Sequence, residues 1–225
     1  AMKKTGVDKQ VFILVATSGD TGKAALEGFC GVEGTQVGVF YPVDGVSPAQ
    51  KLQMITQEGE NTHVCAVKGN FDDAQSAIKR ILNDKEVLHE LKNLGVSLSA
   101  ANSFNWGSLA PQIVYYFSAY CDLVASEEVE PGEKINFVVP TGNFGNVVAG
   151  YYAYRMGLPV NKFIIATNAN NAIVDLFNDG EYDVRRDFFK TMSPSMDVLV
   201  ASNLERLVYD ALGRDDDAVK QAYDS

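Results

Sequence analysis

Hydrophobic residues come in short runs that alternate with amphipathic stretches along this chain, a pattern typical of parallel α/β proteins. The first run, Val11–Ala16, is apolar throughout, which indicates a strand buried on both faces of a sheet. Further strands are predicted at Gln36–Pro42, Thr62–Val67, Val96–Ala101, Phe137–Pro140 and Lys162–Asn168. Helical patterns separate them, among them Pro48–Met54 with Ser47 as its N-cap, Phe71–Asn83 and a long helix Trp106–Val124. We therefore expect an α/β fold of two parallel, doubly wound sheet units, divided near Asn105–Trp106.

The strand Phe137–Pro140 leads into a turn, Thr141–Asn146, that opens a predicted helix. Backbone N–H groups at a helix start, together with the helix dipole, favour an anion and most often a phosphate. We expect Gly142 and Gly145 to permit positive φ, and the two asparagines of the turn to donate to the same anion. An ordinary βα turn is the alternative. The dinucleotide fingerprint is excluded, because its third glycine is missing.

A second polar turn, Thr17–Gly22, follows the first strand and precedes a helix. Its glycine spacing does not fit a P-loop. Asp20–Gly22 matches the aspartic-protease tripeptide, but that fold is all-β and needs a second catalytic Asp, so this class is excluded. Asp20 or Thr21 is expected to be the helix N-cap. The segment Asn102–Asn105 ends another strand. Because ligands collect at the carboxyl ends of parallel strands, we expect these two polar segments on one rim.

Composition and charge exclude several kinds of binding partner. The 225 residues carry a net charge of −10 and no basic cluster, which argues against nucleic acid or an anionic membrane as a partner. No apolar run is long enough to span a membrane. Cys30, Cys65 and Cys121 are widely spaced in apolar surroundings, as expected for reduced core thiols of a cytoplasmic protein. His63 and Cys65 supply two metal ligands at most, so no metal site is expected.

Several motifs together resemble threonine synthase, in the long form of enteric bacteria and fungi. The segments that carry the resemblance follow one another in the expected order: Ala16–Gly22, Tyr41–Pro42, Ser47–Gln50, Ser99–Ser103, Pro140–Gly145, Ala166–Asn168, Met196–Asp197 and Ser202–Asn203. The resemblance implies a pyridoxal-phosphate enzyme of the tryptophan-synthase-β-like fold. It also implies a small-molecule substrate, O-phospho-L-homoserine, which reacts with water to give L-threonine and phosphate.

The resemblance also implies roles for the two turns and the segment after the fourth strand. The cofactor phosphate is expected at Thr141, Gly142, Asn143, Phe144, Gly145 and Asn146. Substrate contacts are expected from Ser18, Gly19, Asp20, Thr21, Asn102, Ser103 and Asn105. A carboxylate cannot donate to a substrate carboxylate, so a capping or orienting role is expected for Asp20.

The chain departs from the family at the catalytic lysine. That lysine forms a Schiff base with the cofactor and lies in a Phe-Lys-Asp context before the first glycine turn, whereas only Lys3, Lys4 and Lys9 precede Val11, without that context. Lys23 is expected on the helix surface. We therefore expect a truncated central fragment that is inactive alone, with residues 6–105 as the small mobile domain and residues 106–225 as part of the large cofactor domain. The alternatives are another pyridoxal-phosphate lyase or dehydratase, or a silent anion-binding paralogue.

Overall fold

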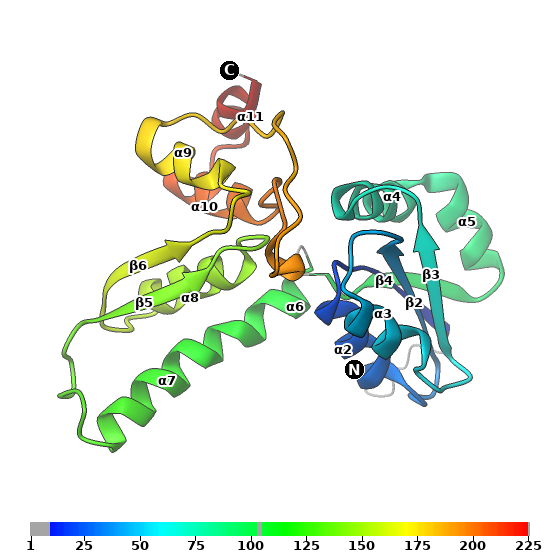
Figure 1. The fold of residues 1–225 in the computed structure, drawn as a ribbon, viewed down its shortest axis with the longest axis horizontal. Helices are drawn as coiled ribbons and strands as arrows, with labels where there is room; N and C mark the ends of the chain where they lie inside the picture. Colours follow the sequence, from blue (N-terminus) through cyan, green and yellow to red (C-terminus); the bar gives the residue numbers. More distant parts are fainter. Residues whose placement is uncertain (1–9, 103–104, 225) are drawn as a thin grey trace. The chain divides into compact units, whose positions relative to one another are not determined.

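The computed structural model describes residues 10–102 and 105–224, which form two compact units (Figure 1). The first unit holds residues 10–102 together with 192–195, and the second holds the remaining described residues. The division falls after Asn102, and each unit has a parallel sheet with helices, as the sequence pattern predicts. No helix in the described residues is long and apolar enough to cross a membrane.

The first unit is built on a four-stranded sheet in the order β3-β2-β1-β4, in which all neighbours are parallel. The strands are β1 (Gln10–Ala16), β2 (Thr35–Pro42), β3 (Thr62–Val67) and β4 (Val96–Ala100). The central strands β1 and β2 are the most buried, which explains why their sequences are nearly continuous apolar runs. Because all four strands are parallel, the loops that follow them lie on one rim of the sheet.

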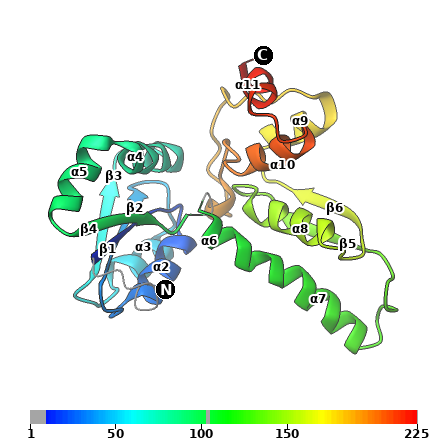
Figure 2. The ribbon, with the colours of Figure 1, turned by 180° about the vertical axis from the view of Figure 1, so that it is seen from behind.

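Helices connect these strands in the manner of a doubly wound fold: α2 (Asp20–Phe29), α3 (Pro48–Ile55), α4 (Phe71–Asn83) and α5 (Lys85–Asn93). The right-handed rule for crossovers places α2 and α3 on one face of the sheet and α4 and α5 on the other (Figure 2). The predicted start of α3 is confirmed, since Ser47 is its N-cap and Pro48 its first residue. Ser47 and Gln50 also exchange hydrogen bonds as a capping box.

The second unit begins with helices where the sequence predicts one long helix from Trp106 to Val124. The structure instead has α6 (Trp106–Leu109), a 3-10 turn (Ala110–Gln112) and α7 (Ile113–Ala125). Pro111 lies in the 3-10 turn, and because proline lacks an N–H group it interrupts the α-helical hydrogen bonds there.

The strands β5 (Ile135–Pro140) and β6 (Val160–Ala166) pair in parallel, and α8 (Gly145–Arg155) connects them. The aromatic rings of Tyr116, Phe137 and Phe163 pack together beneath α8. A Cβ atom at Gly150 would lie 2.6 Å from the Tyr116 ring, so this glycine permits the close approach of α8 and α7. The unit ends with α9 (Ala172–Asp179), a 3-10 turn (Pro194–Met196), α10 (Leu204–Ala211) and α11 (Asp216–Asp224).

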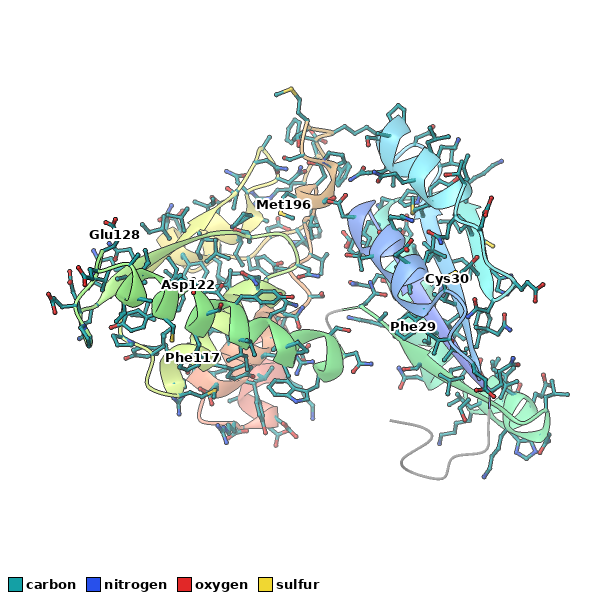
Figure 3. The ribbon with its side chains drawn as sticks, turned by 90° about the horizontal axis from the view of Figure 1, so that it is seen from below. Phe29, Cys30, Phe117, Asp122, Glu128 and Met196 are labelled. Carbon is teal, nitrogen blue, oxygen red and sulfur yellow. The ribbon has the colours of Figure 1, made fainter. Side chains whose placement is uncertain are left out.

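The prediction that the cysteines are core thiols is wrong. Cys65 and Cys121 are exposed, and Cys30 at the end of α2 is only partly buried (Figure 3). Cys65 is on β3, an edge strand of the first sheet, and Cys121 is on a solvent-facing part of α7. Apolar neighbours in sequence did not distinguish an edge strand from a central one.

Candidate functional site

A small cavity opens in the second unit at the carboxyl ends of β5 and β6. Thr141 and Gly142 line it from the loop after β5, and Asn168 and Asn170 line it from the loop after β6. Met196, labelled in Figure 3, closes part of it. The predicted cofactor turn therefore lies at the strand ends, where parallel sheets bind their ligands.

The turn is fixed to the sheet through Thr141. Both the backbone N–H of Thr141 and its hydroxyl donate to the carbonyl of Ala166, at 2.9 and 3.0 Å. The N–H of Phe144 closes the turn on the carbonyl of Thr141 at 2.8 Å. Gly142 has a φ of +44°, and a Cβ atom there would lie 3.3 Å from the side chain of Met196. A side chain at position 142 would thus be strained and would crowd the cavity.

The second positive φ of the turn is at Phe144, not at Gly145 as predicted. Phe144 has a φ of +65° and precedes the first residue of α8, whereas Gly145 is the first helical residue. For a bulky side chain this conformation costs about 1–3 kcal/mol and persists only where the surroundings enforce it. The ring of Phe144 is fully buried and stacks on Phe177, with 6.1 Å between the ring centroids.

Backbone donors at this turn are available to an anion. Among the described residues, the N–H groups of Gly142, Asn146 and Val147 have no hydrogen-bond partner. The first turn of α8 carries no acidic side chain. Three unsatisfied donors at a helix start, with no competing carboxylate, fit the phosphate of pyridoxal phosphate by charge and by hydrogen-bonding capacity.

The side chains of the two asparagines in the turn make bonds within the protein. The Oδ1 of Asn143 accepts the N–H of Gly145 at 2.9 Å. The Oδ1 of Asn146 accepts the hydroxyl of Tyr116 at 2.8 Å, while its Nδ2 donates to Gln112 at 3.0 Å. Burial raises the pKa of Tyr116 to about 12, so this hydroxyl remains a donor at neutral pH. Asn146 is thus held from the side of α7, and its backbone N–H is the group available to a ligand.

A buried carboxylate organises the loop after β6. Asp197 accepts hydrogen bonds from the N–H and the hydroxyl of Thr191 at 2.9 and 2.6 Å, and from the Nδ2 of Asn168 at 2.8 Å. Asn170 adds a longer bond to the same carboxylate at 3.4 Å and also bonds the backbone of Phe189 in both directions. Donors on several sides stabilise the charge of a carboxylate that is only 5% exposed.

The first unit carries the other predicted turn. The hydroxyl oxygen of Thr17 accepts the N–H groups of Gly19 and Gly22, both at 2.9 Å. The N-cap of α2 is Gly19, with a φ of +144°, so the prediction that Asp20 or Thr21 caps the helix is wrong. The side chain of Thr17, the first residue after β1, accepts the hydrogen bonds of the turn instead. The side-chain hydroxyls of Ser18 and Thr21 have no partner among the described residues.

Asp20 has both carboxylate oxygens engaged. Oδ1 accepts the Nε2 of Gln50 at 2.9 Å, and Oδ2 accepts the hydroxyl of Ser195 at 2.7 Å. Gln50 lies directly on the turn, since a Cβ atom at Gly19 would fall 2.3 Å from its side-chain amide. These bonds fix the Asp20 carboxylate against Gln50 and Ser195, and the position of Gln50 leaves no room for a side chain at position 19.

The three remaining predicted substrate residues do not share one structural role. Asn102 is buried and bonds the backbone of Ala16 with both ends of its amide. Asn105 belongs to the second unit, where its Oδ1 caps α6 by accepting the N–H of Gly107 at 2.9 Å. Ser103 lies outside the described residues.

Several residues that shape the two turns were not predicted as site residues. They are Thr17, Gln50, Gln112, Tyr116, Asn168, Asn170, Thr191, Asp197 and Asn203. Gln50 could have been found, because Ser47 and Gln50 have the spacing of a capping box. Tyr116 could not, since a tyrosine on an aromatic helix face is more often core packing.

Comparison with known proteins identifies relatives of this chain. A family model described as pyridoxal-phosphate dependent enzyme matches residues 2–224. The chain is 42% identical over 217 residues to threonine synthase from Pseudomonas aeruginosa, covering 96% of this chain and 44% of the relative. It is 47% identical over 201 residues to threonine synthase-like 1 from Homo sapiens, covering 86% of this chain and 27% of the relative.

Among solved structures, the chain is similar to pyridoxal-phosphate-bound threonine synthase from Brucella melitensis. The TM-score is 0.80 at 42% identity, and the match covers 98% of this chain and 45% of the other. The chain thus spans less than half the length of these relatives. The similarity confirms the predicted fold class and extends over both turns described above.

Proposed function

Because the chain belongs to the family of pyridoxal-phosphate dependent enzymes, we propose that the protein containing it is a threonine synthase. Its substrate would be O-phospho-L-homoserine, whose phosphate would leave the γ-carbon while water adds its hydroxyl to the β-carbon, to give L-threonine and phosphate. The observation that carries the proposal is the turn Thr141–Asn146, with unsatisfied N–H groups at the start of α8, in a chain 42% identical to a threonine synthase.

In this proposal the second unit binds the cofactor phosphate. The N–H groups of Gly142, Asn146 and Val147 donate to its oxygens, and the helix dipole of α8 favours its charge. When bound, pyridoxal phosphate supplies an electron sink for the negative charge that develops on the substrate carbons. The cavity lined by Asn168 and Asn170 lies beside the turn, and their amides, which are bonded to Asp197, would form a fixed polar wall next to the phosphate.

The first unit would bind the amino-acid end of the substrate. The hydroxyls of Ser18 and Thr21 are available as donors at a turn held rigid by Thr17. Asp20 would orient the turn through Gln50 and Ser195 rather than contact the substrate carboxylate, which it would repel.

The lysine that bonds the cofactor covalently is proposed to lie outside the described residues. Lys23, the described lysine nearest the first turn in sequence, is paired with Glu27 at 2.9 Å and also contacts Gln57. The other lysines of the described residues are exposed on the surface. An exposed ammonium is not enclosed in a binding site, as a lysine that forms a Schiff base with a cofactor must be. We also place the protein in the cytoplasm, where its three free cysteines would remain reduced.

A cofactor-binding protein without this reaction is the second candidate. One relative, at 47% identity, is named threonine synthase-like 1 rather than threonine synthase. The full-length protein should be assayed for phosphate release from O-phospho-L-homoserine and, separately, for deamination of serine and threonine. Phosphate release accompanied by L-threonine supports the threonine synthase. Deamination alone indicates a dehydratase, and no turnover with intact cofactor binding indicates the silent candidate.

A further inference from the structure

Asn203, at the start of α10, holds the cofactor turn by its backbone and by its side chain. Its N–H donates to the carbonyl oxygen of Asn143 at 3.1 Å, and its Nδ2 donates to the same oxygen at 3.3 Å. Asn203 is fully buried, and the Nε of Arg206 donates to its Oδ1 at 3.1 Å. The orientation of the amide is therefore fixed, with the oxygen toward Arg206 and the nitrogen toward the turn.

These two hydrogen bonds from Asn203 restrain the peptide that joins Asn143 to Phe144. The carbonyl of that peptide is held by Asn203, and its N–H is held by the carbonyl of Thr141 at 2.8 Å. Rotating a peptide plane changes ψ of the residue before it and φ of the residue after it. Phe144 has the unfavourable φ of +65°, so rotation would relieve strain, and the bonds from Asn203 oppose it.

The orientation of this peptide decides what α8 presents to a ligand. The Asn143 carbonyl is turned toward Asn203, so it does not accept the N–H of Val147 as it would in a continuous helix. The N–H of Val147 therefore remains available, and the N–H of Asn146 beside it has no partner in the described part of the chain either. If the peptide rotated, the carbonyl could turn back toward the helix start and compete with the phosphate for these donors.

We propose that Asn203 is a positioning residue for the cofactor phosphate, acting through the Asn143–Phe144 peptide. This rests on the proposed function, in which the turn Thr141–Asn146 binds that phosphate. Asn203 itself lies behind the turn and contacts the backbone rather than the ligand.

The test compares pyridoxal phosphate with pyridoxal, which has the same aldehyde and ring but no phosphate. In the full-length protein, Asn203→Asp keeps the size of the side chain but replaces the donor with an oxygen facing the Asn143 carbonyl. We expect the affinity for pyridoxal phosphate to fall about tenfold, and the affinity for pyridoxal to change by less than about threefold. A residue that only stabilised the fold would alter both affinities equally.

Asn161→Asp is the matched control, because Asn161 is an exposed asparagine of the same unit whose Nδ2 bonds Asn136 at 3.0 Å. It should leave the ratio of the two affinities unchanged. A folded Asn203→Asp protein that keeps the wild-type ratio overturns the proposal. If that variant fails to fold, Arg206→Ala decides, because it frees the Asn203 amide without changing Asn203. If Arg206→Ala lowers the affinity for pyridoxal phosphate relative to the affinity for pyridoxal, the proposal is supported. If the ratio of these two affinities is unchanged, the proposal is rejected.

The same experiment separates this proposal from the proposed function. If the wild-type protein binds pyridoxal as tightly as pyridoxal phosphate, the phosphate site at Thr141–Asn146 is wrong. If the wild type discriminates and Asn203→Asp discriminates equally well, only the role of Asn203 is wrong.

Discussion

Asn102 bonds Ala16 with both ends of its side-chain amide, accepting the N–H at 3.0 Å and donating to the carbonyl oxygen. The pair joins the carboxyl ends of β4 and β1 just before the turn Thr17–Gly22. The side chain thus continues the hydrogen bonding between β1 and β4 beyond the last residue of β4. Asn102 supports the proposed substrate turn from beneath, through the residue that precedes it.

Removing this amide should destabilise the first unit. Asn102→Ala leaves the N–H and the carbonyl of Ala16 buried without partners, so we expect the free energy of unfolding to fall by about 2–4 kcal/mol. Chemical denaturation followed by circular dichroism measures this loss. Asn93→Ala is the control, because Asn93 is exposed at the end of α5 and its loss should change stability little. Equal stability of the two variants would show that the Asn102–Ala16 bonds contribute nothing.

A side chain at Gly142 should weaken cofactor binding. Gly142→Ala must adopt a φ near +44° and crowd Met196, so the turn should shift and the affinity for pyridoxal phosphate should fall about tenfold. The matched control is Gly31→Ala, which has a similar φ of +66° but no neighbour within 4 Å of the added Cβ. It should carry the same backbone strain without loss of cofactor. Titration of both purified proteins, with thermal melts, distinguishes the effects, and equal affinities would contradict the role of position 142.

No described lysine should bond the cofactor. After incubation of the isolated 225-residue chain with pyridoxal phosphate and reduction with borohydride, peptide mapping should reveal no stoichiometrically labelled lysine. The chain alone should also show no threonine synthase activity. Lys23→Ala in the full-length protein should leave cofactor binding unchanged, because Lys23 is engaged with Glu27 on the surface of α2. A single labelled lysine in the isolated chain, together with turnover, would refute this prediction.

Tyr116 should make stability fall at alkaline pH. Its pKa is about 12 in the folded protein and 10.0 when unperturbed, because burial disfavours the phenolate. Below pH 10 both states are protonated and the contribution is fully present. Between pH 10 and 12 the unfolded state releases its proton first, so stability decreases as pH rises.

Tyr116→Phe should therefore flatten the decline of stability between pH 10 and 12, measured by denaturation at each pH. It should also lower stability at neutral pH, since Asn146 loses the bonds from the hydroxyl. Tyr154→Phe is the control, because Tyr154 is 51% exposed. A pH profile of Tyr116→Phe that parallels the wild type would show that the buried phenol is not responsible.

The order of strands and helices could be predicted from the sequence, because β1 and β2 are nearly continuous apolar runs and the helix after β2 begins with a capping box. The predicted range Thr62–Val67 coincides with β3, and Phe71–Asn83 coincides with α4. Residue type alone gave wrong predictions where the backbone conformation depends on tertiary contacts. The positive φ lies at Phe144, whose ring is buried, and no pattern in the turn itself signals this.

The two proposed turns could be located from the sequence, but the groups that act in them could not be separated. Glycines, hydroxyls and amides at a helix start predict an anion site whichever of them bind the ligand. The structure distinguishes them, because Asn146 has its side chain bonded to Tyr116 while its N–H remains available. Asp197 and Asn203 act on loops 29 and 60 positions away in the chain, a relation that only the fold reveals.

The most direct test of the proposed reaction follows oxygen from solvent. The full-length protein should be incubated with O-phospho-L-homoserine in water enriched in oxygen-18, and both products analysed by mass spectrometry. A carbon–oxygen lyase breaks the bond between carbon and the phosphate oxygen, so the label should appear in the hydroxyl of L-threonine and be absent from phosphate. Label in phosphate, with homoserine as the other product, would mean simple hydrolysis of the phosphate ester and would contradict the assignment.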